Sequence, residues 1–382
     1  MSGRAVERRA EIGVVGAGIL GLAHAYAAAR RGRRVVVFER DTRASGASLR
    51  NFGLLWRIGQ PHGPMYEMAL RSRAEWIQVL NDVGLPYWPE GSVHLVYRDD
   101  EAAVAHEFAE LAPALGYQCV WLSAEKVLAR SPAARPEQLL GGLWSPTEVT
   151  VDPRVTLAAV PAYLVERFAV ELRFGSAVRA IDLPVVEAGT ERWLVDQVIV
   201  CSGADFESLY PQTYADAGLT RVKLQMLRTA AQPDGWRMGP ALAAGLTLRF
   251  YPSFQVCTTL PALRQRIVEE TPEYERWGIH GLVSQTGAGE LTLGDSHEYG
   301  LTVDIFNREE IDQLMLHYIC GFLRAPNWEI AQRWYGVYAK HPEKPYLSLT
   351  PESGVRIVTS PGGSGMTLSF GVAEETMREL GI

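Results

Sequence analysis

A glycine-rich segment near the start of the chain has the spacing needed to hold a diphosphate. Residues 13–21 read Gly-Val-Val-Gly-Ala-Gly-Ile-Leu-Gly, so that Gly16, Gly18 and Gly21 form the pattern GxGxxG. In such a turn the first glycine permits a tight bend, the second admits the backbone close to a pyrophosphate, and the third lets a helix pack closely on a sheet. The helix that begins there presents free N–H groups and the positive end of its dipole to phosphates.

The elements that must position this turn are present on both sides of it. Apolar residues before Gly16 predict a strand, the Ala-rich residues 22–30 predict a helix, and the run Val-Val-Val-Phe at 35–38 predicts a second strand. Glu39 follows that strand, where an acid can accept hydrogen bonds from ribose hydroxyls. Strand, glycine turn, helix, strand and acid together predict a βαβ unit that binds a dinucleotide.

The composition is that of an ordinary globular protein. The chain has 382 residues, enough for two domains or for one large α/β domain with an inserted part. A net charge of −7 gives no reason to expect nucleic acid or an anionic membrane as a partner. The four cysteines form no CxxC pair, so we expect no metal site and no disulfide framework. Residues 1–11 carry charges of both signs and do not resemble a signal peptide, which favours the cytoplasm.

The end of the chain repeats the order strand, glycine turn, helix. Residues 355–359 predict a strand, Pro-Gly-Gly-Ser-Gly at 361–365 predicts a turn, and 366–380 predict a helix. Further helices are expected over 64–83 and 308–323. Strand-like pieces at 222–229, 247–258, 281–285, 290–293 and 333–338 predict a mainly antiparallel sheet in the second half of the chain.

These motifs, in this order, resemble the FAD-dependent amine and amino-acid oxidoreductases of the D-amino-acid oxidase superfamily, above all the sarcosine oxidase and glycine oxidase branch. The markers are residues 16–21, Glu39, 44–51, 68–76, 198–204 and 361–370. A narrower branch of oxidoreductases, some of them associated with aminophosphonate metabolism, shares Arg-Asn-Phe-Gly at 50–53 and Gly-Asp-Ser-His-Glu-Tyr-Gly at 294–300.

The resemblance implies an α/β (α+β) fold with two domains. A Rossmann-like FAD-binding domain is expected over residues 1–90, 145–215 and 325–382. A substrate domain with a mainly antiparallel sheet is expected over 91–144 and 216–324. Sarcosine oxidases bind flavin covalently through a cysteine in the strand that corresponds to residues 334–338, and that cysteine is missing here, so the FAD is expected to be non-covalent.

The same resemblance assigns residues to the cofactor. The first glycine turn would hold the pyrophosphate, the backbone of Val178 would pair with adenine, and the turn at 361–365 would face the flavin, where a helix N-terminus stabilises negative charge. The residues so assigned are Gly16, Gly18, Ile19, Leu20, Gly21, Glu39, Arg40, Ser45, Ser48, Arg50, Asn51, Val178, Ser202, Gly203, Gly336, Gly362, Gly363, Ser364, Gly365, Met366 and Thr367.

The implied reaction is oxidation of the C–N bond of a small amine that carries an anionic group. Sarcosine or another N-methyl or simple amino acid is the first expectation, and an aminophosphonate is the second. The imine would hydrolyse, and O2 would reoxidise the flavin to give H2O2. The lysine and the arginine that grip a carboxylate in related oxidases correspond here to Thr367 and Tyr338. The candidate substrate residues are therefore Tyr338, Arg249, Tyr251, His297, Lys340 and Arg57, with Arg249 and Tyr251 expected on a strand facing the flavin.

Other interpretations stay open at this level. Arg249 could be a surface arginine of a sheet, His297 a turn-capping residue and Lys340 a solvated side chain. An NAD-dependent dehydrogenase would need only the first βαβ unit, and a flavoprotein that transfers electrons or assists assembly would need no substrate site. The strand expected at 250–259 lacks the oxygen-activating lysine of sarcosine oxidases, which leaves a dehydrogenase possible unless Lys223 or Lys340 replaces it. The sequence does not give the oligomeric state.

Overall fold

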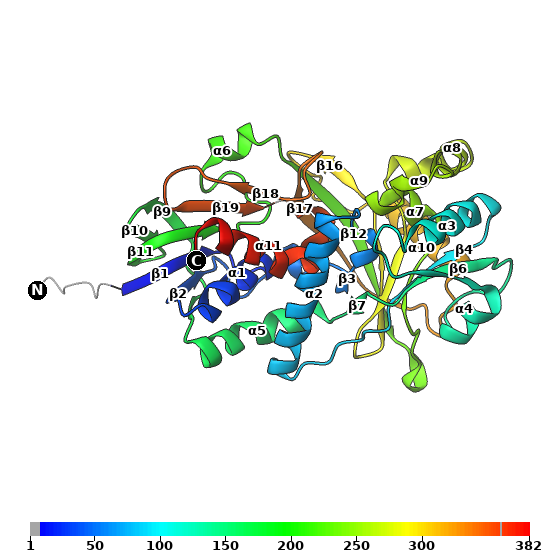
Figure 1. The fold of residues 1–382 in the computed structure, drawn as a ribbon, viewed down its shortest axis with the longest axis horizontal. Helices are drawn as coiled ribbons and strands as arrows, with labels where there is room; N and C mark the ends of the chain where they lie inside the picture. Colours follow the sequence, from blue (N-terminus) through cyan, green and yellow to red (C-terminus); the bar gives the residue numbers. More distant parts are fainter. Residues whose placement is uncertain (1–7, 360) are drawn as a thin grey trace, which may run out of the picture.

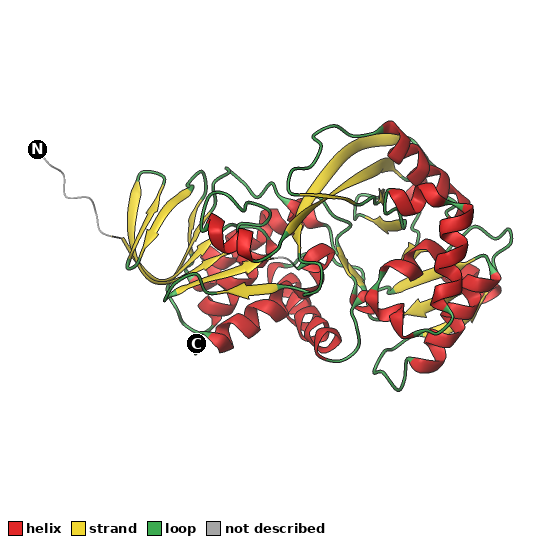
Figure 2. Ribbon diagram, turned by 90° about the horizontal axis from the view of Figure 1, so that it is seen from above, coloured by secondary structure: helices red, strands yellow, loops and turns green. Residues whose placement is uncertain are grey.

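The computed structural model describes residues 8–359 and 361–382 and consists of two lobes (Figures 1 and 2). Most of the stretch that was compared with a signal peptide, residues 1–7, lies outside the described residues. Within the described ranges, no helix has both the length and the apolar character needed to cross a bilayer. Each lobe is built on its own sheet, and the fold class predicted from the sequence, a mixed α/β fold, is confirmed.

The first lobe contains an eight-stranded sheet whose central strands are parallel. Its main order is β18-β19-β11-β1-β2-β8, with β9 and β10 added beside β11. The bounds are β1 Arg8–Val15, β2 Val35–Phe38, β8 Glu171–Arg173, β9 Val178–Asp182, β10 Val185–Ala188, β11 Glu191–Val200, β18 Leu347–Leu349 and β19 Val355–Thr359. The carboxyl ends of β1, β2 and β11 therefore meet at one edge, where ligands bind in such sheets.

Alternation along the strands sorts their side chains between two cores. Val35 and Val37 of β2 join a core formed with four helices, whereas Val36 and Phe38 face the opposite side. The four helices are α1 (Ile19–Arg30), α2 (Pro64–Val83), α5 (Pro153–Phe168) and α11 (Gly365–Glu379). In Figure 1 the blue α1 and the red α11 lie side by side, so the two ends of the chain share one core.

The second lobe contains a nine-stranded, mainly antiparallel sheet. Its main order is β16-β12-β15-β14-β13-β4-β6-β5, and β17 pairs with the opposite edge of β12 along Thr220 to Thr229. The strands are β4 Ser92–Val96, β5 Val120–Ser123, β6 Gly141–Ser145, β12 Thr220–Ala231, β13 Ala241–Ala243, β14 Leu282–Gln285, β15 Glu290–Gly294, β16 Glu298–Gly300 and β17 Ile330–Lys340. The helices are α3 Asp99–Leu111, α4 Ala124–Arg130, α7 Gly245–Phe250, α8 Leu260–Glu270, α9 Pro272–Arg276 and α10 Glu309–Phe322.

Shorter elements complete the chain. They are the paired strands β3 (Leu54–Leu55) and β7 (Val149–Thr150), the helix α6 (Pro211–Asp216), and the 3-10 turns η1 Ala47–Leu49, η2 Arg57–Gly59, η3 Pro233–Gly235, η4 Pro252–Val256 and η5 Gly362–Ser364. The helices predicted at 64–83, 308–323 and 366–380 are confirmed to within one residue at each end.

One predicted strand, residues 247–258, is wrong. Its alternating apolar residues form the short helix α7 and the turn η4 instead. The backbone N–H of Leu246 donates to the hydroxyl of Tyr318, and the hydroxyl of Thr247 donates to the carbonyl of His280. Burial on all sides and these long-range hydrogen bonds override the local strand pattern.

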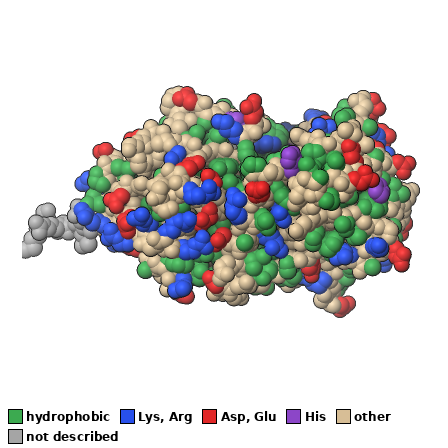
Figure 3. Space-filling view, in the orientation of Figure 1, with side chains coloured by type: hydrophobic (Ala, Val, Ile, Leu, Met, Phe, Trp, Pro, Cys, Tyr) green, Lys and Arg blue, Asp and Glu red, His purple; other side chains and the backbone are tan. Residues whose placement is uncertain are grey.

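The two lobes have separate hydrophobic cores. This supports the division into two domains, which remains a proposal. One strand crosses that division, because β17 lies in the segment assigned to the FAD-binding domain and pairs with β12 of the second sheet. On the surface, Figure 3 shows basic side chains gathered over the first lobe with acidic side chains among them. Arg30 and Arg31, for example, both pair with Glu374.

Candidate active site

A cavity of about 1430 Å3 is lined by residues of both lobes. It exceeds the roughly 300–1,000 Å3 of a pocket for a drug-sized ligand, so it has room for a dinucleotide and a small substrate together. Its walls begin at the carboxyl ends of β1, β2 and β11, pass the start of α11, and end against β17 and the loop after β15.

The glycine turn after β1 is shaped to admit a phosphate. Gly16 has a φ of +102°, and a Cβ on it would lie 2.4 Å from the carbonyl oxygen of Cys201. A Cβ on Gly18 would lie 3.1 Å from the hydroxyl oxygen of Ser48, which accepts a hydrogen bond from the N–H of Ile19. The turn and the start of α1 therefore line the cavity with backbone, and the Ser48 hydroxyl lies beside them, an arrangement that fits a diphosphate.

Gly21 has the packing role that was predicted for it. It lies outside the cavity lining, and a Cβ there would come within 1.9 Å of the carbonyl oxygen of Gly16. The absence of a side chain thus lets α1 approach the end of β1.

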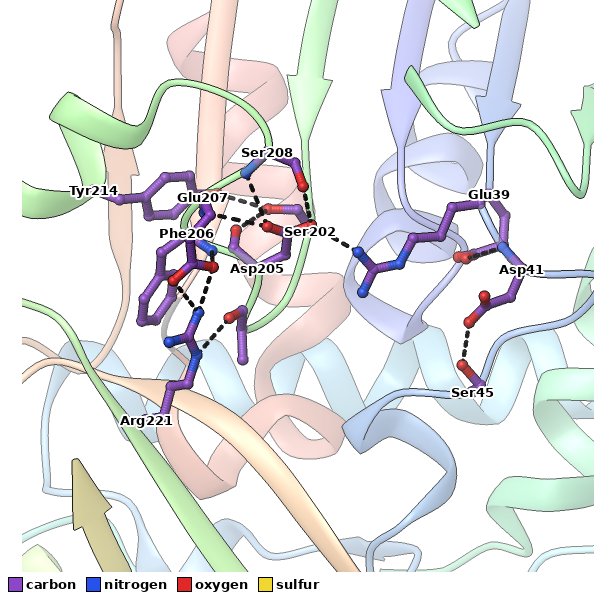
Figure 4. Close-up of polar contacts among 12 residues, drawn as sticks. Glu39, Asp41, Ser45, Ser202, Asp205, Phe206, Glu207, Ser208, Tyr214 and Arg221 are labelled. Carbon is purple, nitrogen blue, oxygen red and sulfur yellow. Dashed lines mark hydrogen bonds and ion pairs between the residues drawn. The ribbon is translucent and has the colours of Figure 1, made fainter. Parts of the chain in front are cut away.

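Two polar groups face each other at the end of the cavity next to the glycine turn (Figure 4). On one side, Glu39 accepts hydrogen bonds from the N–H groups of Ala17 at 2.8 Å and Asp41 at 3.0 Å. On the other side, Asp205 follows β11, and Arg40 reaches across to it with a 2.7 Å ion pair. Although burial opposes the change, hydrogen bonds from Ser208 and Glu207 and the charge of Arg40 lower the pKa of Asp205.

The start of α11 forms the opposite end of the cavity. The turn η5 leads into Gly365, and the first helical turn carries no acidic residue, so its dipole is free to stabilise an anion. The amide of Gln60 donates to the hydroxyl of Ser364 at 2.9 Å and thereby holds the turn. A Cβ on Gly363 would lie 3.6 Å from the hydroxyl of Tyr338, which places that phenol beside the turn.

Three titratable side chains meet in the part of the cavity beyond this turn. Nε2 of His280 lies 3.0 Å from Oδ1 of Asp295, and Nε2 of His297 lies 3.9 Å from Oδ2 of the same carboxylate. The side chains line the cavity, yet His280, Asp295 and His297 are only 1%, 6% and 5% exposed. Burial lowers the pKa of His297 to about 4, and the neighbouring imidazoles lower the pKa of Asp295 against the effect of its burial.

Hydrogen bonding in this cluster is incomplete. Nδ1 of His280 is buried and has no hydrogen-bond partner among residues 8–359 and 361–382, and Oδ1 of Asp295, although only 3.0 Å from Nε2 of His280, is not aligned with it for a hydrogen bond. Each such atom costs roughly 1–3 kcal/mol unless a ligand or water satisfies it. Because His280 lines the cavity, a bound molecule or a water there can pair with its Nδ1.

Aromatic rings close the space around the cluster. Phe250 stacks on His280 with ring centroids 4.0 Å apart, and Tyr251 meets the same imidazole edge-on at 5.7 Å. Burial, followed by the charge of Asp295, raises the pKa of both Tyr251 and Tyr338, so both phenols stay protonated and can donate hydrogen bonds.

The structure brings most of the predicted site residues to this one cavity. Those that line it are Gly16, Gly18, Ile19, Leu20, Glu39, Arg40, Ser45, Ser48, Arg50, Asn51, Val178, Ser202, Gly203, Gly336, Gly362, Gly363, Ser364, Gly365 and Met366, together with Tyr251, His297, Tyr338 and Lys340. Thr367, like Gly21, lies behind the lining, where its hydroxyl accepts a hydrogen bond from the N–H of Trp56.

The expected position of Arg249 is wrong. It lies on α7 and outside the cavity lining, and its guanidinium donates to Glu275 at 2.9 Å and to the carbonyls of Leu246, Tyr274 and Ile279. These partners hold the side chain inside the second lobe. Residue 249 lies in a helix and not in the predicted strand, so its side chain does not face the cavity.

Two further cations that the sequence offered also lie outside the lining. Arg57 stacks on Tyr66, with its guanidinium carbon 3.7 Å from the ring centroid. Lys223 is buried, 3.5 Å from a carboxylate oxygen of Glu298. Of the lysines and arginines predicted to contact the substrate, Lys340 lines the cavity. Its Nζ lies 6.0 Å from the ring centroid of Phe250.

Sequence reasoning missed His280, Asp295 and Phe250 as parts of the site. Asp295 had a signal, because it stands two residues before His297, and residues two apart in extended chain share a face. The position of His280 depends on strand pairing and left no local signal.

The chain is similar in sequence to a known protein family and to curated proteins. Residues 11–378 match the model of the family described as FAD dependent oxidoreductase. A curated glycine oxidase from Geobacillus kaustophilus (strain HTA426) is 28% identical over 163 residues, which cover 41% of this chain and 43% of that protein. The aligned part therefore spans less than half of that relative.

Solved structures share the fold over nearly the whole chain. The crystal structure of glycine oxidase from Geobacillus kaustophilus has a TM-score of 0.76 at 20% identity and covers 98% of this chain and 94% of its own. That of L-proline dehydrogenase from P. horikoshii has a TM-score of 0.78 at 19% identity and covers 98% and 95%.

Proposed function

Since the chain belongs to the family of FAD-dependent oxidoreductases, we propose that it oxidises the C–N bond of a small amine that carries an anionic group. Sarcosine or another N-methyl or simple amino acid is the first candidate. One observation carries the proposal. The cavity continues past the start of α11 into a compartment lined by Tyr251, Tyr338, Asp295, His297 and Lys340, which offers both charge signs to one small molecule.

The residues of the cavity fit FAD. Gly16 and Gly18 bring the start of α1 to the cavity wall, Glu39 lies beside them at the end of β2, and the helix N-terminus at Gly365 lies at the far end. We propose that Glu39 and the first turn of α1 hold the ADP half and that the turn at 362–366 faces the flavin. The strand at 334–338 has no cysteine, which supports non-covalent binding.

FAD, when bound, supplies a two-electron acceptor for a hydride equivalent from the substrate. The chain itself orients the substrate and keeps water out. Phe250 and Tyr251 cover the compartment, and Lys340 is the proposed partner of the anionic group. The positive end of the α11 dipole favours the negative charge of a reduced flavin.

We propose O2 as the electron acceptor, with H2O2 as the product. The alternative acceptor is a second redox partner, as in a dehydrogenase. Peroxide formed per substrate oxidised separates the two, because an oxidase gives about one per turnover and a dehydrogenase gives far less. We propose Lys340 rather than Lys223 as the lysine that activates oxygen, since Lys340 lines the cavity and Lys223 does not.

An aminophosphonate is the second candidate substrate. The two segments that resemble the narrower branch, residues 50–53 and 294–300, both contribute to this cavity, through Arg50, Asn51 and Phe52 and through Asp295 and His297. Lys340 is a compact charge that suits a phosphonate as well as a carboxylate.

The test is anaerobic mixing of the purified protein with a panel of carboxylate and phosphonate amines. The protein should be yellow, should release its flavin on denaturation, and should lose its flavin absorbance with at least one amine of the panel. Colourless protein that takes up no FAD, or flavin that no amine bleaches, contradicts the proposed function. Flavin that remains with the denatured chain contradicts the non-covalent binding alone.

A further inference from the structure

The imidazole of His297 has a tautomer that its surroundings fix. Its Nδ1 lies 2.9 Å from the carbonyl oxygen of Gly278. A carbonyl oxygen can only accept, so Nδ1 must carry the hydrogen. In the neutral ring Nε2 is then a bare acceptor, and it points toward the carboxylate of Asp295.

Two acceptors therefore face each other across a gap in the cavity wall. Nε2 of His297 and Oδ2 of Asp295 are 3.9 Å apart, too far for a direct hydrogen bond and with no hydrogen between them in the neutral state. A nitrogen that carries two hydrogens fits this gap, because it can lie about 2.9 Å from both atoms at once. A primary or secondary ammonium group is such a nitrogen, and its charge matches the carboxylate.

The groups around this gap favour a molecule that carries both an ammonium group and an anionic group. The ring of Phe250 lies 4.6 Å from the ring of His297, and an aromatic face attracts an ammonium group. Lys340, whose Nζ lies 3.2 Å from the hydroxyl of Tyr299, also lines the cavity, and its positive charge can bind an anionic group. A small molecule with an amine at one end and an anion at the other can meet both charges.

We propose that Asp295 and His297 bind the ammonium group of the substrate and that His297 removes one of its protons before oxidation. This inference rests on the proposed function, because it assigns the amine end of the same substrate. In the step, one N–H bond of the ammonium breaks, its electron pair stays on the amine nitrogen, and the proton forms a bond to Nε2 of His297. Burial opposes the resulting imidazolium and the carboxylate of Asp295 stabilises it, and the free amine is the form from which a hydride can leave the adjacent carbon.

Other charged and titratable groups also face this pair and enter its pH dependence. They are His280, Tyr251, Tyr338, Tyr299 and Lys340, and His94 acts on His280 in turn. The comparison of variants below keeps all of them constant.

The first measurement is binding without reaction. The probes are 2-aminoisobutyrate, which has no hydrogen on the carbon beside nitrogen, and pivalate, which has a methyl group in place of the ammonium. Their binding to the FAD-containing protein is followed by the change in flavin absorbance. We expect the wild type to prefer 2-aminoisobutyrate and Asp295→Asn to weaken its binding about tenfold, while pivalate binding changes by less than about twofold.

The second measurement is the rate of anaerobic flavin reduction against pH, with the amine that reduces the wild type fastest. Asp295→Asn and His297→Gln should each slow reduction about a hundredfold at pH 7. In both variants the rate should recover toward pH 10, where a simple amine loses its proton in solution. Asp312→Asn is the matched control, because Asp312 is a buried acid held by Gln225 and Arg333 outside the cavity.

The outcomes are separate from those of the proposed function. If no amine reduces the wild type, the proposed function fails. If the wild type is reduced and Asp295→Asn, with normal FAD content, keeps the same rate and pH profile, this inference alone is overturned. Equal binding of the two probes by the wild type also overturns it. So does a stoichiometric metal ion in the purified protein whose removal by a chelator abolishes probe binding.

Discussion

The carboxylate of Glu39 accepts a hydrogen bond from the backbone N–H of Ala17 at 2.8 Å, so the acid at the end of β2 is joined to the glycine turn at the end of β1. Replacing Glu39 with Ala should weaken FAD binding about tenfold, because it removes both this bond and the proposed ribose acceptor. Titration of the apoprotein with FAD, followed by quenching of flavin fluorescence, measures the change. Glu187→Ala on β10 is the control, and equal affinities of the two variants would contradict the assignment.

Gly16 should not tolerate a side chain. Gly16→Ala places a Cβ 2.4 Å from the carbonyl oxygen of Cys201 at a φ of +102°. We expect a loss of roughly 1–3 kcal/mol in the free energy of unfolding and a lower FAD content. Gly321→Ala is the control, since nothing lies within 4 Å of a Cβ at that helical position. Urea unfolding of both variants tests the difference, and equal unfolding midpoints would refute it.

Arg249 should matter for stability and not for the substrate. Arg249→Met removes the guanidinium from Glu275 and from three buried carbonyl groups, which should lower the free energy of unfolding by roughly 2–4 kcal/mol. The KM of the folded, FAD-containing variant for the best amine should stay within about threefold of the wild type, since Arg249 lies outside the cavity. A larger rise in KM with unchanged stability would contradict this prediction and would indicate that Arg249 binds the anionic group of the substrate.

Lys340 should act on the anionic end of the substrate. Lys340→Gln should raise KM for an anionic amine about tenfold, with little effect on KM for an uncharged analogue of similar size. Steady-state kinetics with both amines checks this, and Lys126→Gln, on α4 and outside the cavity lining, is the control. A similar rise in KM for both amines would show that the lysine does not recognise the anion.

Glu107 should make stability depend on pH in the acidic range. Its carboxylate accepts four hydrogen bonds from the N–H and hydroxyl groups of Thr258 and Thr259. Although burial opposes them, these bonds lower the pKa of Glu107 from its usual 4.5 to about 2. A carboxyl group with a lowered pKa stabilises the fold above pH 4.5 and loses that effect as the pH falls toward 2.

The variant Glu107→Gln tests that dependence. Because the group is solvent-accessible, we expect a loss of only about 1 kcal/mol at pH 7, and a difference from the wild type that shrinks below pH 4.5. Urea unfolding at several pH values measures it. A difference that is constant between pH 7 and pH 3 would mean that the charge contributes nothing.

The parts of the fold that depend on neighbouring residues could be predicted from the sequence. The first βαβ unit was predictable because the glycine spacing, the two apolar strand runs and Glu39 all lie within about 30 residues. The helix at 64–83 was predictable because its apolar stripe recurs at helical spacing and ends at Gly84, whose φ of +75° suits a helix end.

The substrate compartment could not be predicted in the same way, because strand pairing assembles it. Strand β14 pairs with β15 so that Leu282 lies opposite Gly294. Extending that antiparallel register places residue 280 opposite residue 296, between Asp295 and His297. No local pattern around His280 carries this information. The same holds for α7, where hydrogen bonds from distant residues decide the backbone.

The cavity walls come from distant parts of the sequence, from Val15 to Leu368. During synthesis the glycine turn after β1 leaves the ribosome long before the turn at 362–366. Until α11 has been made it cannot pack beside α1, and the cavity lacks one of its walls. We therefore expect the cofactor to bind only after α11 has been synthesised, and a product that terminates before Gly365 to lack the helix that completes the cavity.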